Sequence, residues 1–302
     1  SPSRGLGDVY KRQEYRCDIM EILLGALGIT LVTGFFYYEN NGISTTNYEV
    51  DCGIGKDINV VHLSDLHGKE FGKNNEKLKR SILKEKPDLV VATGDMIDSS
   101  LKNMEGVIDF LSDLSKCVKV VYISGNNEQR CKKAEYIFES LKSKGVIVLR
   151  NEIITLSLNG VKVNILGMFE KPKGDLHSSL KKINGSYAYE DSHKLFKRLE
   201  GLEGLKIVLS HYPELFEAEY LKYDFHIMFS GHAHGGQFRI PIVKRGLIAP
   251  GQGIFPKYTE GMHGNKNKLI ISRGLGNSTK ITRLFNSCLL YTSPSPRDGL
   301  LS

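Results

Sequence analysis

The chain contains no tryptophan, only 5 cysteines in 302 residues, and no CxxC pair. This cysteine spacing predicts neither a zinc knuckle nor a disulfide framework. A GxSxG motif is also absent, so the chain has no nucleophile elbow of the serine-hydrolase type. Apolar residues make up 40% and charged residues 25%, the composition of an ordinary globular protein. The composition therefore excludes a disordered chain and a membrane protein with many spans.

The two ends of the chain can be encoded by the same DNA in opposite orientations. DVYKRQ, within residues 1–13, can be written GAT GTG TAT AAG AGA CAG, and the reverse complement, read one base in, encodes the CLLYT that begins at Cys288. This DNA resembles the transposon-end adapter used in sequencing libraries. We therefore expect residues 1–13 and 288–302 to be translated adapter outside the natural fold, and the natural C-terminus to be missing.

The net charge of the chain is +7, from 41 basic and 34 acidic residues. Residues 1–13 carry +2 of it and residues 288–302 none, which leaves +5 for the rest. Such a mild basic excess suits a protein near anionic membranes or phosphate-containing ligands. It is too small to predict nucleic-acid binding, and we expect none.

An uncharged run of 17 residues, 22–38, follows Met20 and ends in the aromatic cluster FFYY. Seventeen residues are the lower limit for a spanning helix, and terminal aromatic residues suit the membrane interface. A cleaved signal peptide and a buried core helix are the alternatives, but the run lacks a basic start and a small-residue cleavage site. We expect a membrane anchor at 20–38 and a linker at 39–55. Its orientation stays open, because no Lys or Arg lies between Met20 and Lys56.

Short apolar runs alternate with amphipathic stretches over the rest of the chain. This alternation predicts an α/β arrangement in the first half, and the strand-rich second half predicts a second sheet. The expected helices cover residues 76–84, 104–114 and 134–142. The expected strands cover residues 58–63, 89–92, 118–123, 161–166, 207–209, 226–229 and 269–271.

Five short polar motifs each follow one of the expected strands directly. Because ligands of α/β folds sit beyond the carboxyl ends of strands, all five motifs are expected to converge on one crevice. Their carboxylates, imidazoles and amides form a mixed oxygen and nitrogen donor set that suits Mn, Fe, Zn or Co. The motifs are Asp65-Leu66-His67, residues 94–98 (GDMID), residues 125–128 (GNNE), Ser210-His211 and residues 231–236 (GHAHGG).

Each motif alone is a weak signal. A histidine after a strand is more often a surface or capped residue than a ligand, and a Gly-Asp pair is usually a turn. His232 and His234 are more specific, because residues i and i+2 of an extended segment point the same way. The ordered set carries the prediction, since coincidence would have to produce all five motifs.

The ordered set resembles the calcineurin-like metallophosphoesterase superfamily, whose pattern is D-x-H, G-D-x-x-D, G-N-H-D/E, H and G-H-x-H. The resemblance covers about residues 59–286. GHAHGGQFRIP and the later SRGLGNS resemble the bacterial membrane-anchored branch, which includes enzymes similar to UDP-2,3-diacylglucosamine pyrophosphatase. The resemblance implies two packed mixed β-sheets flanked by helices, in a domain at 56–287, anchored in a bacterial cell membrane.

The resemblance also implies a site for two divalent metal ions. The ions would lie about 3.5–4 Å apart, hold the phosphate and lower the pKa of a water that attacks phosphorus. Asp95 would bridge both ions, and we expect Asp95, Asn126, Asn127 and His232 to be the catalytic residues. The expected ligands are Asp65, His67 and His234 for one ion, and Asn126, His211 and His232 for the other.

Asn127 departs from the family pattern, because it stands where the family usually has a histidine that assists the leaving group. Asparagine cannot donate a proton as a general acid. Alkyl phosphoesters are therefore expected to react slowly, whereas the hydrolysis of diphosphates and activated esters should be slowed less.

Three further polar residues have simpler interpretations. Asp98 is either a partner of the metal ligands or a helix N-cap, and both interpretations stay open. His62 and His226 lie in expected strands and are predicted to be structural.

The leading functional prediction is a membrane-anchored phosphoesterase that cleaves a phosphodiester or diphosphate bond of a lipid-linked or nucleotide-sugar substrate. A phosphodiesterase of a soluble nucleotide and a non-catalytic metal-binding scaffold are the alternatives. The complete ligand set disfavours the scaffold. The exact substrate, the metal, the membrane side and the oligomeric state stay open.

Overall fold

The computed structural model describes residues 3–170, 187–236, 239–240, 245–246, 248–249, 252–277 and 288–293. Its centre is a pair of six-stranded sheets. Parts of two quoted sequence segments lie outside these ranges, namely residues 237–238 and 241 of GHAHGGQFRIP and residue 278 of SRGLGNS.

The first sheet has the strand order β1-β16-β2-β3-β4-β5, in which β2 to β5 are parallel. Parallel neighbours need crossover connections, and α2, α3 and α5 supply them. The strands are β1 (Ile43–Asn47), β2 (Val60–Leu63), β3 (Leu89–Thr93), β4 (Lys119–Ile123) and β5 (Ile147–Val148). The helices are η1 (Lys73–Asn75), α2 (Glu76–Lys84), α3 (Met104–Ser115), α4 (Asn126–Arg130) and α5 (Ala134–Ser143).

The second sheet has the order β14-β15-β9-β8-β7-β6, with a parallel centre and an antiparallel strand at each edge. Two short hairpins, β10-β11 and β12-β13, lie outside both sheets. The larger elements are β6 (Glu152–Leu158), β7 (Val161–Gly167), α7 (Tyr187–Glu200), β8 (Leu205–Leu209), η2 (Phe216–Tyr220), β9 (Ile227–Ser230), η3 (His234–Gly236), β14 (Gly261–His263) and β15 (Lys268–Ile271). The hairpin strands are β10 (Arg239–Ile240), β11 (Arg245–Gly246), β12 (Ile248–Ala249) and β13 (Gly253–Ile254).

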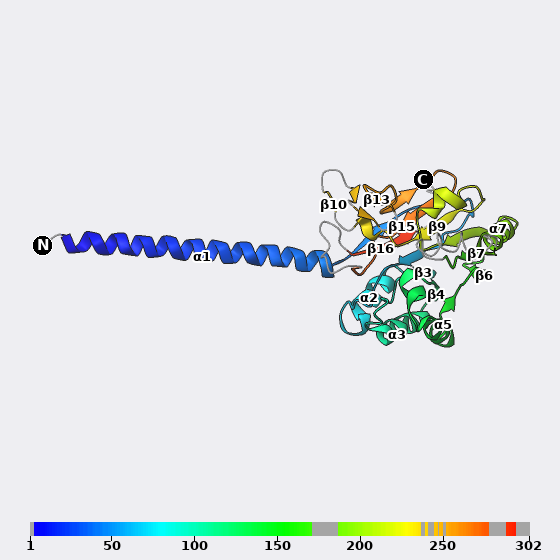
Figure 1. Ribbon diagram of the computed structural model, residues 1–302, viewed down its shortest axis with the longest axis horizontal. Helices are drawn as coiled ribbons and strands as arrows, with labels where there is room; N and C mark the ends of the chain where they lie inside the picture. The colour runs from blue at the N-terminus through cyan, green and yellow to red at the C-terminus, as the bar shows by residue number, and fades with distance from the viewer. Residues whose placement is uncertain are drawn as a thin grey trace, which may run out of the picture.

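Three apolar clusters hold the layers together. One lies between the two sheets, where Val91 and Ile123 of the first sheet meet Ile207 and Phe229 of the second. A second cluster packs α2, α3 and α5 on the outer face of the first sheet, and Figure 1 shows these helices together on that side. A third cluster packs α7 on the second sheet. The expected arrangement of two sheets flanked by helices is confirmed, and each expected element lies within two residues of its predicted bounds.

The helix α1 (Ser3–Asn41) projects from the domain as one long rod (Figure 1). Its stretch Met20–Asn41 has 22 residues and a mean hydropathy of 1.7, and no residue in its apolar 18-residue window is buried. At 1.5 Å per residue this stretch is about 33 Å long, enough to cross a hydrocarbon core of about 30 Å. The absence of burial excludes a core helix within the described chain. A signal sequence passes the same test of length and composition, so the anchor stays a prediction.

β16 (Cys288–Ser293) corrects the expectation that residues 288–302 lie wholly outside the fold. It pairs parallel with β1 and antiparallel with β2, so it fills the position between them. Without a strand there, β2 would present an unpaired edge, and CLLYTS contains residues that favour strands. The adapter origin of this segment stays a prediction, because strand pairing depends on the residues and not on the source of their DNA.

The expected linker at 39–55 contains regular structure at its start. α1 continues to Asn41, and β1 begins at Ile43, so one residue separates helix from strand. The N–H of Gly42 donates to the carbonyl oxygen of Tyr38 at 2.7 Å and closes the last turn of α1. The polar residues of this segment predict a loop by composition, but Thr45 and Thr46 are β-branched and pair as a strand.

Candidate metal centre

The loops after β2 and β3 lie side by side at the carboxyl edge of the first sheet. The N–H of Asp65 donates to Gly94 O and the N–H of His67 donates to Asp95 O, each at 3.0 Å. The loop after β9 joins them, because the N–H of His232 donates to both carboxylate oxygens of Asp65 at 3.1 and 3.2 Å. Motifs far apart in the sequence therefore meet at one edge, as the strand order predicts.

The first ligand group consists of Asp65, His67 and His234, whose ligand atoms all lie within 4.8 Å of one another. The Nε2 atoms of the two histidines are 3.3 Å apart, and His234 Nε2 is 3.5 Å from Asp65 Oδ1. Ser64 donates its hydroxyl to Asp65 Oδ2 at 2.5 Å. The group is buried and able to hold a metal ion.

The second ligand group consists of Asp95, His211 and His232, again within 4.8 Å. His211 Nε2 lies 3.5 Å from Asp95 Oδ2 and 3.2 Å from His232 Nδ1. The other ring nitrogen of His211 is 2.7 Å from the carbonyl oxygen of Thr93. This contact orients the ring so that Nε2 faces the group, a common arrangement for a metal-binding histidine.

Asp95, a member of the second group, also approaches the first. Its Oδ2 is 3.5 Å from His211 of the second group and 4.0 Å from His67 of the first. Asn126, the seventh expected ligand, is buried, and its Oδ1 has no hydrogen-bond partner among the described residues. A buried carbonyl oxygen without a partner is costly unless a cation occupies its lone pairs. This orphan oxygen and the mixed oxygen and nitrogen donor set fit two divalent ions.

Charges of opposite sign compensate each other in the site. Burial opposes protonation of His211, yet the Asp95 carboxylate raises the pKa of His211 to about 10. Burial also disfavours the charge on Asp95, but His211 and then His67 hold the pKa of Asp95 well below its usual range. At Asp65 burial dominates and raises the pKa. Divalent cations can therefore replace the imidazolium protons when they bind.

Five of the expected site residues adopt the left-handed backbone conformation, which side chains other than glycine rarely take. Such a conformation costs on the order of 1–3 kcal/mol and clusters at functional sites. Here this backbone conformation directs the side chains of several sharp loops into the same space. The residues are Asp65 (φ 52°), His67 (φ 50°), Asp95 (φ 51°), His232 (φ 68°) and His234 (φ 47°).

Two glycines permit the close approach of the site loops. Gly94 has φ 90°, and a Cβ there would strike the backbone of Gly125. A Cβ on Gly231 would strike the hydroxyl of Ser64 and the carboxylate of Asp65. Both motifs therefore need glycine at this position, because a side chain would push the ligand loops apart.

Asn127 has a contact that its position in the motif does not predict. Its backbone N–H donates to Asp95 Oδ1 at 2.8 Å, and its side-chain Nδ2 donates to Asp95 Oδ2 at 2.6 Å. The residue is only partly buried, so it lies at the solvent side of the site. Asn127 thus orients the carboxylate of the second ligand group that approaches the first.

The interpretations of Asp98 and His62 are also settled by contacts. Asp98 Oδ2 is 3.7 Å from His67 Nδ1, and its Oδ1 accepts from the N–H of Ser100 at 2.8 Å. It therefore contacts His67, an expected ligand, and closes a turn, whereas α3 begins only at Met104. His62 is buried against Phe229, its Nε2 lies 2.7 Å from Thr93 Oγ1, and burial lowers its pKa to about 3. His62 is structural, as expected.

Two carboxylates that were not among the expected site residues hold the site loops. Glu128 is fully buried and accepts from the N–H groups of Asp95, Ile97 and Gly125 at 2.9 to 3.0 Å. Burial and then Asp95 raise the pKa of Glu128 to about 7. The acidic end of the GNNE motif was the available signal for this residue.

Glu170 is the second such carboxylate and carried no motif signal. It accepts from the hydroxyl of Ser210 at 2.5 Å, from the N–H of His211 at 3.1 Å and from the hydroxyl of Tyr220 at 2.6 Å. Glu170 therefore fixes the backbone that carries His211.

Replacing Glu170 with glutamine is expected to weaken metal binding at the second ligand group by roughly 10- to 100-fold, the usual effect of losing a partner that orients a ligand. Glutamine keeps the volume but turns one acceptor into a donor. Titration of metal-stripped protein with Mn²⁺ or Zn²⁺ measures the change, with thermal unfolding as a check on folding. Glu217→Gln, at an exposed residue paired with Lys257, should leave affinity unchanged. Equal affinities in all three proteins would contradict the role of Glu170.

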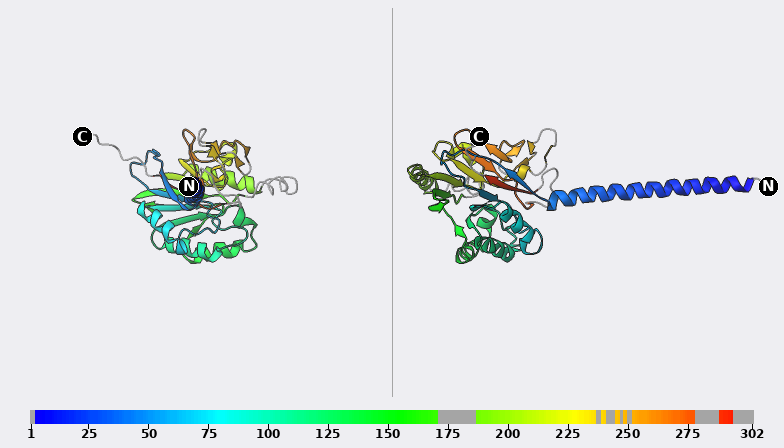
Figure 2. Two further views of the ribbon diagram at one scale, coloured as in Figure 1. Left: turned by 90° about the vertical axis from the view of Figure 1, so that its left-hand side faces the viewer. Right: turned by 180° about the vertical axis from the view of Figure 1, so that it is seen from behind.

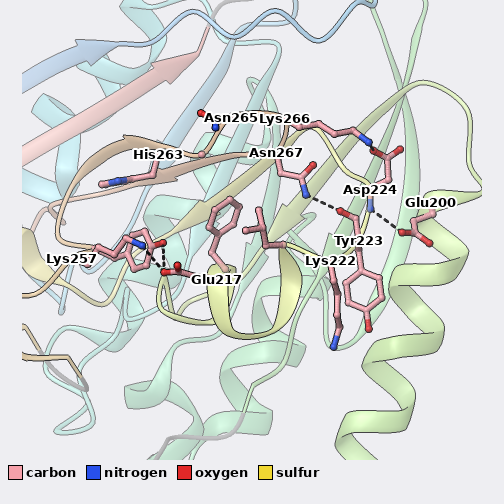
Figure 3. Close-up of a pocket in the computed structure, with 14 residues that line it drawn as sticks. Glu200, Glu217, Lys222, Tyr223, Asp224, Lys257, His263, Asn265, Lys266 and Asn267 are labelled. Carbon is pink, nitrogen blue, oxygen red and sulfur yellow. Dashed lines mark hydrogen bonds and ion pairs between the residues drawn. The ribbon is translucent and has the colours of Figure 1, made fainter.

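A separate depression of about 560 Å³ lies beside η2 and the turn between β14 and β15 (Figure 3). Its charged groups already face one another, with Lys257 2.6 Å from Glu217 and Lys266 2.7 Å from Asp224. None of the expected site residues lines it. The depression therefore does not compete with the metal centre as a reaction site.

Comparison with known proteins agrees with this geometry. The sequence model of the family described as Calcineurin-like phosphoesterase matches residues 58–236, more than half of the chain and all five motifs. The chain is 27% identical over 270 residues to the metallophosphoesterase YkoQ of Bacillus subtilis, covering 85% of this chain and 93% of the relative. It is 30% identical over 253 residues to the metallophosphoesterase YkuE of the same bacterium, covering 80% and 81%.

A third relative, the phosphodiesterase YaeI of Escherichia coli, is 28% identical over 226 residues, covering 72% of this chain and 74% of the relative. The family uses a dinuclear divalent metal centre, which agrees with the two ligand groups. The resemblance to UDP-2,3-diacylglucosamine pyrophosphatase is not tested by these relatives and stays a prediction.

Proposed function

Because this chain belongs to the calcineurin-like phosphoesterase family of metal-dependent hydrolases, we propose that it cleaves a phosphodiester or diphosphate bond while α1 anchors it to a bacterial membrane. The observation that carries the proposal is the pair of adjoining ligand groups, in which Asp95 of the second group lies within 4.0 Å of His67 of the first. The family acts on phosphate-containing substrates, and the lipid-linked or nucleotide-sugar character of the substrate belongs to the proposal.

Each protein group has a definite task in this reaction. Asp65, His67 and His234 would hold one ion, Asn126, His211 and His232 would hold the other, and Asp95 would contact both. Two bound divalent ions supply a water of lowered pKa and neutralise charge on the phosphate. The left-handed loops and the Glu128 carboxylate keep these ligands in place, so little reorganisation is needed when substrate arrives.

The leaving group is where this site differs from its family. Asn127 donates its backbone N–H and one side-chain N–H to Asp95, and its amide cannot act as a general acid toward a departing oxygen. Substrates with weakly basic leaving groups, such as diphosphates, therefore suit this site better than simple alkyl esters. The complete ligand set argues against a non-catalytic scaffold.

A phosphodiesterase of a soluble nucleotide is the second candidate. The similarity to a phosphodiesterase of Escherichia coli supports a diester substrate but does not place it in a membrane. The exposed apolar surface of Met20–Asn41 supports the membrane-bound alternative, because 22 residues of this hydropathy would be costly to leave in water.

Metal removal tests the proposed reaction. Chelation of the full chain is expected to abolish hydrolysis of bis-nitrophenyl phosphate and of a nucleotide-sugar diphosphate. Addition of Mn²⁺, Zn²⁺, Fe²⁺ or Co²⁺ should restore activity together with about two ions per chain, measured by elemental analysis. Activity that survives chelation, or full binding of two ions with no hydrolysis of any phosphoester or diphosphate tested, would refute the proposal.

A further inference from the structure

The last turn of α1 is hydrogen-bonded to loops of the metal centre. The ammonium group of Lys69, two residues after the ligand His67, donates to the carbonyl oxygen of Asn40. The amide of Asn277 donates to Asn40 Oδ1 at 3.3 Å. A cation at the carboxyl end of a helix also interacts favourably with the helix dipole. The end of the apolar helix is therefore fixed against the site and not held apart from it by a spacer.

A pocket of about 700 Å³ lies beside the first ligand group and the two residues that bond to the end of α1. His67 contributes to its wall, so the pocket reaches the metal centre. Lys69 and Asn277, the two residues bonded to Asn40, also line it. The remaining lining residues are Gly68, Glu70, Lys102 and Asn103.

The aromatic cluster at residues 35–38 puts this pocket close to a membrane surface. Aromatic residues concentrate at the interface between the hydrocarbon core and water, and Tyr37 and Tyr38 are 72% and 65% exposed. Asn40 lies two residues beyond Tyr38, which is about 3 Å along a helix axis. The mouth of the pocket would therefore lie at the depth of lipid headgroups.

The β12-β13 hairpin supports the same orientation. Figures 1 and 2 show β13 at the end of the domain from which α1 leaves. Ile254 of β13 and the next residue, Phe255, are 71% and 55% exposed. Large apolar side chains at this end suit contact with a bilayer surface rather than with water.

We propose that the pocket beside His67 receives the phosphate-bearing headgroup of a membrane lipid, whose acyl chains stay in the bilayer. The inference rests on the proposed function and names its substrate class. The exposed ammonium group of Lys102 binds an anionic oxygen of the headgroup, while the Glu70 carboxylate accepts from a headgroup hydroxyl or amine. The phosphate then enters the metal centre past His67 without the lipid leaving the membrane.

A matched pair of substrates tests this inference. The lipid substrate is the nitrophenyl phosphodiester of dioleoylglycerol in phosphatidylcholine vesicles, and its soluble twin is the nitrophenyl phosphodiester of glycerol. The full chain, with metal added, is reconstituted into the same vesicles. We expect the lipid substrate to react at least tenfold faster at equal bulk concentration, because α1 holds the pocket at the surface where that substrate is concentrated.

Lys102→Glu and Lys102→Met are expected to lower kcat/KM for the lipid substrate by about tenfold or more, the usual effect of losing a charged hydrogen bond. The soluble twin carries the same phosphodiester and should lose a similar factor, so the fall in kcat/KM reports the contact of Lys102 with the phosphate. Lys84→Glu makes the same charge change at an exposed position of α2 outside the pocket and should leave kcat/KM for both substrates unchanged.

The outcomes separate this inference from the proposed function. Hydrolysis of both substrates at equal rates, or an unchanged kcat/KM in both Lys102 variants, would overturn the lipid-headgroup pocket but leave the metal-dependent reaction standing. Failure of the metal-bound chain to hydrolyse these two phosphodiesters and the nucleotide-sugar diphosphate would overturn the proposed function itself.

Discussion

Replacing Asp95 with asparagine is expected to abolish hydrolysis of every phosphoester substrate. Asp95 Oδ2 lies 3.5 Å from His211 Nε2 and 4.0 Å from His67 Nε2, so this carboxylate of the second ligand group also faces the first. The substitution removes the negative charge that would balance two divalent ions. Metal ions contribute several kcal/mol of charge stabilisation to phosphoryl reactions, which corresponds to about a thousandfold in rate or more.

Two measurements check the Asp95 prediction. Elemental analysis should find fewer than two ions per chain, and turnover should fall alike for alkyl and nitrophenyl substrates. Asp109→Asn provides a matched control, because Asp109 is an exposed aspartate paired with Lys144 on the far side of α3 from the core. A variant at Asp95 that keeps both ions and normal turnover would show that this carboxylate does not join the two groups.

Replacing Asn127 with histidine is expected to raise turnover selectively for alkyl phosphoesters, by on the order of a hundredfold, while nitrophenyl substrates change little. An imidazole can give a proton to a poor leaving group, and general acid help is typically worth a hundredfold or more. Nitrophenolate leaves without such help. The metals should stay bound, because the backbone N–H of Asn127, which the substitution keeps, still donates to Asp95 Oδ1.

Asn127→Ala separates the two tasks of this position. Alanine removes the donation from Nδ2 to Asp95 Oδ2 without adding an acid. Turnover of both substrate types should therefore fall by similar factors. If Asn127→His instead changes the turnover of both substrate types equally, or releases metal, Asn127 does more than occupy the place of a general acid.

The ordered motifs alone located the candidate site. Each motif follows an apolar run long enough for a buried strand, and parallel strands bring their carboxyl ends to one edge. For that reason Asp65, Asp95 and His211 could be grouped from the sequence, and the structure places them in two buried ligand groups that adjoin each other. The helical spacing of apolar residues predicted α2, because Leu78 and Ile82, four residues apart, both face the core.

Weaker local patterns hid several elements. β6 is an edge strand that is only partly buried. Polar residues interrupt its apolar ones, so the sequence shows no continuous apolar run there. The Asn159-Gly160 turn, with φ 50° and 77°, marks its hairpin with β7 and was the available signal. β16 carries no cue to its place, since pairing between β1 and β2 depends on strands more than 200 residues away in the chain.

The sequence by itself determined which residue types carry the chemistry, because metal ligands and close-packed glycines tolerate few substitutes. Only the tertiary structure decided how those residues act together. Glu170 is 41 residues from His211, and Lys69 is 29 residues from Asn40, so no local pattern links either pair. Hydrogen bonds between distant segments form only where packing of the two sheets brings their loops together. Sequence spacing predicts the ligands, and long-range packing decides what holds them and which way the site faces.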